Sequence, residues 1–478
     1  MATGKQQTDH LLSLIREGKR MTLAQQLRLA ALLSVPAVIA QFSSIAMQYI
    51  DASMVGHLGA NAAASIGLVS TTTWLFNGVC SAVATGFSVQ VAHLIGAGDF
   101  AKARRVLRQS FTGALLFALS LAATGAAISG KLPEWLGGDP VIRRDSSLYF
   151  LIFSLFVPVL QFNFLAGGML RCSGNMRIPS LLNVMMCALD VLFNFILIFP
   201  TREAAFGGHS FTIYGAGLGV EGAALGTVLA ETVTVSAMMW YLCVRSPMLR
   251  IAKERGSFRL RKAIVRKAAN IALPIGFEHA AICGAQIMTT VIVAPLGIVA
   301  IAANSFAIIA ESLCYMPGFG IAEAATTLVG QSLGAGRPKL TRSFANITVL
   351  SGMAVMGAMG VLLYVGAPQI IGVMTPVDDI RILGADILRI EAFAEPMFAA
   401  AIVTYGVFVG VGRTVVPSLM NFGSIWGVRL TLAAILAPTM GLRGVWIAMC
   451  IELTFRGAIF LVRLWGTKWV RRPSFGQG

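Results

Sequence analysis

One segment of this chain occurs twice. The triplet GAG, followed by basic residues, begins at Gly96 and again at Gly334, 238 residues later. The same offset, without a gap, aligns further identical residues: Pro36 with Pro274, Leu58-Gly59 with Leu296-Gly297, Pro158 with Pro396, Gly174 with Gly412, and Asn183 with Asn421. Self-similarity at one long period is the signature of a duplicated structural unit, here of roughly 240 residues. The fold must therefore consist of two similar halves.

The apolar content places both halves in a membrane. Hydrophobic residues make up 56% of the chain, charged residues make up 12%, and the mean hydropathy is +0.77. This composition leaves too little polar surface for a water-soluble globule of 478 residues. Apolar runs of about 20 residues, the length of a helix that crosses ~30 Å of hydrocarbon, recur along the sequence. Twelve such runs begin near Ala30, Ala62, Val106, Leu148, Ile178, Tyr214, Val265, Val299, Ile347, Ile387, Val415 and Leu442.

The basic residues follow the sides of the membrane rather than one face that could bind nucleic acid. The net charge is +16, yet the Lys and Arg residues gather in alternate loops. These loops contain Lys102, Arg104, Arg105 and Arg108; Arg171 and Arg177; Arg245 to Lys267; and Arg337, Lys339 and Arg342. The other loops carry few of them, so the positive-inside rule predicts that the basic loops and both termini are cytoplasmic.

The repeat and the spans together define the domain organisation. Six spans per copy is an even number, so both copies enter the membrane in the same direction, as a parallel repeat. We predict a cytoplasmic amphipathic lead-in (residues 1–29), an N-terminal six-helix lobe (30–244), a basic cytoplasmic linker (245–267), a C-terminal six-helix lobe (268–466) and a cytoplasmic tail (467–478). Near the end of each copy the offset falls from 238 to 222, so the first copy is 16 residues longer. We place the excess in the exterior segment 201–214.

Several kinds of site are not indicated by the sequence. The seven cysteines lie in or beside apolar runs, and neither they nor the five histidines have the spacing of a metal site or of a disulfide framework. Neither GAG segment continues to Gly-Lys-Ser/Thr, so a phosphate-binding loop is not expected there. No nucleophile–base pair stands out, and we expect no enzyme, no cofactor and no bound metal.

Two intramembrane carboxylates occur in the first half alone. Asp51 aligns with Thr289 of the second half, and Asp190 aligns with Val428. Both lie at similar depth below the outer ends of their spans, and Asn183, Asp190 and Asn194 share one helix face. Thr227, in the sixth span, lies at comparable depth. A charged carboxylate costs at least a few kcal/mol in a bilayer, so such groups mark an ion or substrate path or belong to a structural hydrogen-bond network.

The second half has its own ionisable residues. Four glutamates are candidate cation contacts of that half, with local helix packing as the alternative: Glu278, Glu311, Glu323 and Glu395. Glu452 and Arg456 stand four residues apart on the last span and are expected to pair. Arg429 is either a partner of that pair or a residue that contacts an anion.

The order of these motifs resembles the multidrug and toxic compound extrusion (MATE) transporters. The resemblance spans nearly the whole chain and rests on DASMVGHLGA, QVAHLIGAGDFAKARR, VGQSLGAGRPKLTR, LRCSGNMRIPSLLN, VGVGRTVVPSLMN, GVEGAALGT and GLRGVWIAM. It implies an all-α membrane protein with twelve helices in two six-helix lobes around a central cavity. It also implies export, chiefly of organic cations, against inflow of protons or sodium ions.

Four site residues match the family residue by residue. Asp51 matches an acidic residue of the first helix, Asp190 and Asn194 match a fifth-helix motif, and Thr227 matches a sixth-helix threonine. The pattern is most similar to the DinF-like bacterial branch, although there the asparagine precedes the aspartate. Glu278 follows Pro274 by only four residues, earlier than the seventh-helix glutamate of sodium-coupled members.

These observations predict an ion-coupled antiporter that exports amphipathic, cationic small molecules, with the proton favoured over sodium as the coupling ion. The alternatives are a lipid-linked oligosaccharide flippase and an exporter of flavin-like or other anionic metabolites. We expect a monomer in the bacterial inner membrane whose partners are the lipid bilayer and a small-molecule substrate, with no nucleic acid.

Overall fold

A computed structural model describes residues 2–206, 209–252, 255–466 and 468–470. The first half comprises α1 (Ala2–Arg16), α2 (Leu23–Gly56), α3 (Ala60–Gly96), α4 (Phe100–Ser129), α5 (Leu132–Trp135), α6 (Pro140–Leu155), α7 (Val157–Cys172), α8 (Arg177–Ile198), β1 (Pro200–Phe206), β2 (His209–Ala216), α9 (Gly219–Trp240) and the π-helix η1 (Tyr241–Arg245). The second half comprises α10 (Lys262–Val293), η2 (Ala294–Leu296), α11 (Ile298–Gly334), α12 (Pro338–Met374), α13 (Asp378–Ala392), α14 (Glu395–Val411), α15 (Val415–Phe422), the π-helix η3 (Gly423–Arg429), α16 (Leu430–Trp465) and η4 (Lys468–Val470).

The helices supply the twelve predicted spans. Among the described residues, nine helical segments are long and apolar enough to cross a bilayer. Two further spans are bent helix pairs, α6–α7 at 48° and α13–α14 at 57°. The last segment, Val415–Trp465, is 51 residues long and is interrupted at Gly441, where φ is 61° and ψ is −143°. This interruption divides the segment into the eleventh and twelfth spans.

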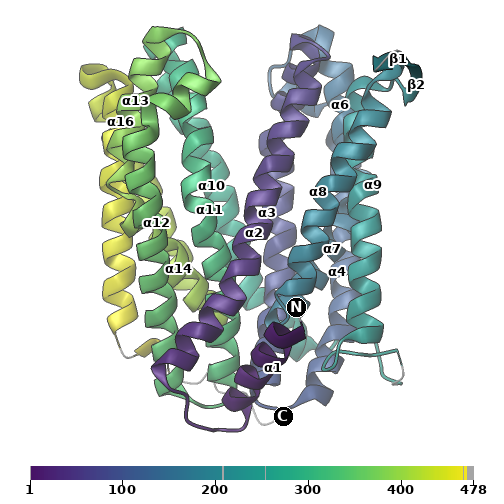
Figure 1. Ribbon diagram of the computed structural model, residues 1–478, viewed down its shortest axis with the longest axis vertical. Helices are drawn as coiled ribbons and strands as arrows, with labels where there is room; N and C mark the ends of the chain where they lie inside the picture. The colour runs from purple at the N-terminus through teal and green to yellow at the C-terminus, as the bar shows by residue number, and fades with distance from the viewer. Residues whose placement is uncertain (1, 207–208, 253–254, 467, 471–478) are drawn as a thin grey trace.

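The spans form two lobes that are related by the repeat. Helices α2 to α9 form the first lobe and α10 to α16 form the second (Figure 1). Between the lobes, α2 packs against α11 and α3 packs against α10, two pairs that the repeat makes equivalent. The lobes lie close together at the end that holds α1 and the GAG turns, and they diverge toward the opposite end, which holds the β1–β2 hairpin (Figure 1). We call these the GAG end and the hairpin end.

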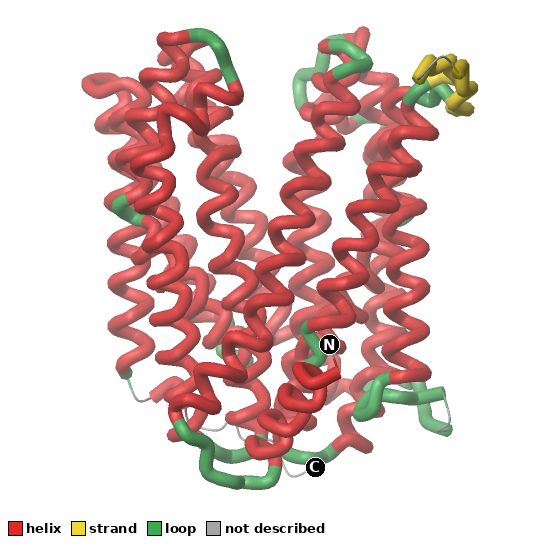
Figure 2. Tube along the Cα trace, in the orientation of Figure 1, coloured by secondary structure: helices red, strands yellow, loops and turns green. Residues whose placement is uncertain are grey.

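The hairpin accounts for the extra residues of the first half. β1 and β2 pair antiparallel from Pro200–Ala216 to Phe206–His209, with an irregularity between Pro200 and Arg202. The hairpin extends from one corner of an otherwise helical bundle (Figure 2). The sixth span begins at Gly219 rather than near Tyr214, because Tyr214 belongs to β2. The predicted start of this span was therefore wrong by five residues.

The repeated GAG triplet has two structural functions. The first glycine of each copy lies where α3 crosses α11, and a Cβ on either Gly96 or Gly334 would come within 2.0 Å of a backbone oxygen of the other helix. Those oxygens belong to Gln331 and His93, which are themselves equivalent in the repeat. The second glycine, Gly98 or Gly336, has a φ of 76° or 72°, a left-handed conformation that ends the helix at little cost. The duplicated motif is thus a crossing point of the lobes followed by a tight turn.

An acidic cap stabilises the first of these turns. The Asp99 carboxylate accepts a hydrogen bond from the backbone N–H of Lys102 at 3.0 Å and pairs with the Lys102 ammonium at 2.8 Å. Hydrogen bonding to Lys102 lowers the pKa of this loop carboxyl. The carboxylate is therefore ionised when it caps α4.

The lead-in helix α1 packs against both lobes at the GAG end. Its apolar side chains Leu11, Leu12, Leu14 and Ile15 are buried against residues of α2, α11 and α12. Arg337 of the second lobe donates to the Leu14 carbonyl at 3.0 Å. On the first-lobe side, the Arg16 guanidinium lies 5.9 Å from the centroid of the Phe100 ring. The amphipathic pattern of this segment is therefore used for packing on the helix bundle.

Candidate functional site

Three helices of the first lobe bring the predicted polar residues together. The Asn194 amide, on α8, donates to Asp51 Oδ1 of α2 at 2.9 Å and to Asp190 Oδ2 at 3.1 Å. Asp190 also interacts with Asp51 and with Thr227 of α9. The spacing of four residues between Asp190 and Asn194 places both side chains on one face of α8, where α2 and α9 pack. We call Asp51, Asp190, Asn194 and Thr227 the first-lobe cluster.

Asp190 and Asn194 of this cluster are buried, Asp51 and Thr227 are half-buried, and the cluster is incompletely hydrogen-bonded. Asp190 is 0% exposed and Asn194 is 1% exposed. Asp190 Oδ1 and Asn194 Oδ1 are buried without a hydrogen-bond partner in the described part of the chain. Buried oxygens of this kind retain capacity for a proton or a cation. The arrangement can therefore bind either ligand, and two adjacent carboxylates in a low-dielectric site would titrate as a pair.

A glycine makes room for the amide at the centre. A Cβ on Gly226 of α9 would lie 2.0 Å from Asn194 Oδ1. The absence of a side chain at this position lets α9 approach α8 closely enough for Thr227 to reach Asp190. The sequence GVEGAALGT therefore has a direct steric function in the cluster.

The structure brings Tyr149 to the predicted set and leaves Asn183 apart from it. The Tyr149 side chain, on α6, lies close enough to interact electrostatically with both Asp51 and Asp190. Nothing in the sequence near Tyr149 indicated this proximity, because it depends on how α6 packs against α9. Asn183 lies seven residues before Asp190, about 10 Å along the helix, and the described contacts do not join it to the cluster.

Glu278 lies in a separate polar group of the second lobe. Ser418 Oγ donates to Glu278 Oε2 at 3.0 Å, and Asn421 Nδ2 donates to Oε1 at 2.5 Å. Tyr405 hydrogen-bonds to the same carboxylate. Both oxygens thus have donors from α14 or α15, which is the arrangement of a satisfied buried carboxylate.

Arg429 is a partner of the predicted pair on the last span. Its guanidinium donates to Glu452 Oε2 from Nε at 2.9 Å and from Nη2 at 2.6 Å. Arg456 Nε lies 3.0 Å from Glu452 Oε1, and the Ser424 hydroxyl donates a hydrogen bond to that oxygen at 2.6 Å. Glu452 is therefore held by two arginines, and the open choice for Arg429 is resolved in favour of the ion pair.

The remaining candidate glutamates lie in two separate parts of the structure. Glu323 lies 3.6 Å from Arg171 of the first lobe, near the GAG end, with both side chains partly exposed. It bridges the lobes and lies apart from the other acidic residues. Glu311 and Glu395 lie deeper, together with Glu391, which the sequence reading missed. Glu391 comes close to Glu311 because α13 packs against α11, which the residue spacing within one helix does not indicate.

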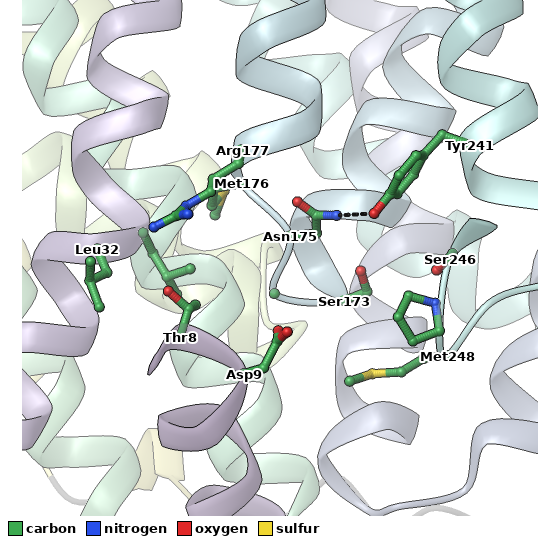
Figure 3. Close-up of a pocket in the computed structure, with 13 residues that line it drawn as sticks. Thr8, Asp9, Leu32, Ser173, Asn175, Met176, Arg177, Tyr241, Ser246 and Met248 are labelled. Carbon is green, nitrogen blue, oxygen red and sulfur yellow. Dashed lines mark hydrogen bonds between the residues drawn. The ribbon is translucent and has the colours of Figure 1, made fainter. Parts of the chain in front are cut away.

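A small pocket at the GAG end is a poor candidate for a substrate site. It has a volume of about 50 Å³ and lies between α1, α2, the α7–α8 turn and the segment after η1. In Figure 3, Thr8 and Asp9 of α1 face this pocket, and Asn175 donates to the Tyr241 hydroxyl at 3.3 Å. Drug-sized ligands occupy sites of ≈300 Å³ or more. This pocket is therefore a packing gap beneath α1.

Comparison with known proteins identifies the family. A model of the MatE family matches residues 36–196 and 274–435, one segment in each repeat. The chain belongs to the MatE family. Its relatives include a probable multidrug resistance protein NorM of Thermotoga maritima, 26% identical over 461 residues, which cover 92% of each chain. The uncharacterized transporter YisQ of Bacillus subtilis is 22% identical over 427 residues, covering 88% of this chain and 90% of YisQ.

Solved structures of this family confirm the fold. The crystal structure of a MATE protein in complex with MaD3S has a TM-score of 0.85 at 20% identity, and the match covers 96% of this chain and 98% of that one. A MOP superfamily transporter from Pyrococcus furiosus, described as having a binding pocket of reversed polarity, has a TM-score of 0.84, covering 95% and 96%. The prediction of a twelve-helix, two-lobe MATE protein is confirmed. Assignment to the DinF-like branch stays a prediction.

Proposed function

We propose that this MatE protein is a proton-coupled antiporter that exports amphipathic, cationic small molecules. The observation that carries the proposal is the first-lobe cluster, in which one amide joins the buried Asp190 carboxylate to the half-buried Asp51 carboxylate inside a membrane helix bundle. Membership of a family that includes multidrug resistance proteins supports efflux as the activity. The relatives are transporters rather than enzymes, which agrees with the prediction that the chain is not an enzyme.

The chemistry of the cluster supports exchange of a proton for a cation. With Asp51 and Asp190 ionised, the site presents negative charge to a cation in a region of low dielectric constant. Protonation removes that charge and converts a carboxylate from an acceptor into a donor. Binding of the proton and of the substrate drives alternating access to the two sides of the membrane only if the two ligands favour different states of the lobes. Antiport follows if protonation weakens substrate binding in the state that faces outward.

The orientation in the membrane is part of this proposal. The basic loops lie at the GAG end, so we assign that end, with both termini, to the cytoplasm of a bacterial inner membrane. The lobes then converge on the cytoplasmic side and diverge toward the exterior (Figure 1). We treat the transporter as a monomer that needs no cofactor other than its coupling ion.

An anion-selective exporter or an oligosaccharide flippase would require unpaired cationic groups facing the substrate. Two arginines of the second lobe, the buried Arg456 and the half-buried Arg429, are instead held by Glu452. The first-lobe cluster is acidic. Both features favour a cationic substrate.

Substitution of the two aspartates tests the proposal. Asp51→Asn and Asp190→Asn remove the charge but keep the shape and one acceptor oxygen, so each variant should insert and fold while export falls to the level of empty vesicles. Asp379→Asn, at an exposed position at the start of α13, is the matched control and should keep parental export. Parental export by either cluster variant would show that the cluster is only structural.

A further inference from the structure

A groove on the outer surface of the second lobe lies apart from every group used above. It has a volume of about 440 Å³ and lies between α12, α13 and α16. Ile390, Phe393, Ile447 and Ile451 make most of its lining apolar, and among the described residues Arg389 is the only charged one that lines it. Phe393 is 71% exposed and Ile451 is 46% exposed, so the groove opens away from the protein, toward lipid. We call it the Arg389 groove.

A proline in α12 fixes the position of Arg389. Pro368 has no N–H, so the carbonyl of Tyr364, four residues earlier, lacks its usual helical partner. Arg389 Nε donates to this carbonyl at 3.3 Å, and the guanidinium lies 5.7 Å from the centroid of the Tyr364 ring. The Phe393 ring packs edge-on against the same tyrosine, with 5.5 Å between centroids. Arg389 is thus held through Nε, and its two Nη groups make no hydrogen bond with the described residues.

The positive charge of Arg389 has no counter-ion in the part of the chain that the structure describes. Asp386, one turn earlier on α13, is already paired with Arg443 at 2.6 Å. Glu391 follows by two residues, which places it on another side of the helix, and it is 0% exposed. A charge that faces lipid is costly unless an opposite charge comes to it. The missing partner is therefore an anion from outside the protein.

The depth of the groove is suited to a lipid headgroup. Tyr364 lies ten residues before Met374, the last residue of α12, so the groove is ~15 Å from the hairpin end of that helix. The 37 residues of α12 are ~55 Å long, ~25 Å more than the hydrocarbon layer. With this excess divided between the two ends, the guanidinium lies only ~3 Å inside the hydrocarbon, where a phosphate can reach it.

The second lobe alone has this arrangement. At the repeat offset of 238 residues, Leu151 is the equivalent of Arg389 and Ala126 is the equivalent of Tyr364. The first lobe therefore lacks both the cation and the ring on which it lies. Since the duplicated fold forms without them in one copy, the fold itself does not require Arg389.

We propose that the Arg389 groove is a binding site for an anionic phospholipid of the leaflet at the hairpin end. The lipid phosphate accepts hydrogen bonds from both Nη groups of Arg389, because guanidinium and phosphate match as a bidentate pair. One acyl chain lies over Phe393, Ile447 and Ile451. No carboxylate beside Arg389 is free to pair with the ammonium of a zwitterionic headgroup, so the site selects a lipid with net negative charge, such as phosphatidylglycerol. This inference goes beyond the proposed function and does not depend on the coupling ion.

Native mass spectrometry of the whole purified protein measures this binding directly. The protein is titrated with dioleoylphosphatidylglycerol and, separately, with dioleoylphosphatidylethanolamine. Arg389→Leu, which introduces the residue of the first lobe, should weaken the tightest phosphatidylglycerol adduct ~10-fold or more, the effect of losing hydrogen bonds to a charged group. Binding of phosphatidylethanolamine should not change. Arg381→Leu is the matched control on the same helix, because Arg381 already pairs with Asp378 at 3.3 Å, and it should bind both lipids as the parent does.

The other outcomes would each overturn the proposal. Equal affinity of the parent and Arg389→Leu for phosphatidylglycerol would show that Arg389 does not bind the lipid, and an equal loss of both lipids would show that the groove selects acyl chains only. Displacement of the phospholipid by inorganic phosphate would assign the site to a free anion. If Arg389→Leu fails to fold because the Tyr364 carbonyl loses its donor, Ile447→Trp decides, since it fills the groove and keeps Arg389. Parental phosphatidylglycerol binding by Ile447→Trp would refute the site.

Discussion

Gly96→Ala tests the explanation of the repeated motif. The added Cβ would lie 2.0 Å from the Gln331 backbone oxygen, against an ordinary contact of 3.4 Å or more, so α3 and α11 must separate locally by about 1.4 Å. Overpacking of this kind costs ~1–3 kcal/mol. Because α3 and α11 touch at Gly96 only while the lobes lie close together at the GAG end, Gly96→Ala destabilises this conformation. A difference of 1–3 kcal/mol corresponds to a 5–150-fold shift of the equilibrium toward the state that is open at the GAG end.

Distance measurements between the lobes read this shift directly. Spin labels at Ala101 and Lys339, which are exposed and equivalent in the repeat, report the separation at the GAG end in a cysteine-free background. Gly96→Ala should increase the population at longer distance, and Gly334→Ala should do the same. Gly67→Ala, in α3 with nothing within 4 Å of its Cβ, is the matched control. Equal distance distributions and equal thermal midpoints for Gly96→Ala and Gly67→Ala would refute the reasoning.

Three further predictions concern the cluster, the topology and the lead-in helix. Gly226→Ala places a Cβ 2.0 Å from Asn194 Oδ1, so export should fall at least ~10-fold, the effect of ~1.4 kcal/mol, while the protein stays inserted; parental export would mean that the amide is dispensable. A cysteine at Tyr214, which is 78% exposed in the hairpin, should react with an impermeant maleimide added to intact cells, and one at Lys339 should not; the reverse result would invert the topology. Leu12→Asp introduces a charge where the side chain is 2% exposed, so α1 should detach and the segment between α1 and α2 should be cut faster by trypsin; an unchanged cleavage rate would show that α1 is not held by its apolar face.

The architecture could be predicted from the sequence because many residues support each element of it. Each span is supported by about 20 apolar residues and by its copy in the other half. The first-lobe cluster was also predictable, since Asp51 and Asp190 are unusual residues at equal depth. The packing of α2 and α9 against α8 then brings Asp51, Asp190, Asn194 and Thr227 together.

The features that were missed depend on geometry that no helical periodicity encodes. The proximity of Glu391 and Glu395 to Glu311 depends on how α13 and α14 pack against α11. The partner of Glu323 is Arg171 of the other lobe, which depends on how the two lobes dock. The steric function of the first GAG glycine likewise appears only when α3 and α11 cross.

In the proposed mechanism, inflow of protons drives export through the first-lobe cluster. The most direct measurement is export of a fluorescent cation by purified protein in sodium-free vesicles under an imposed pH gradient. We predict export that requires the gradient, stops when a protonophore dissipates it, and is absent in Asp190→Asn. No export under the pH gradient, with export restored by a sodium gradient at constant pH, would contradict the claim.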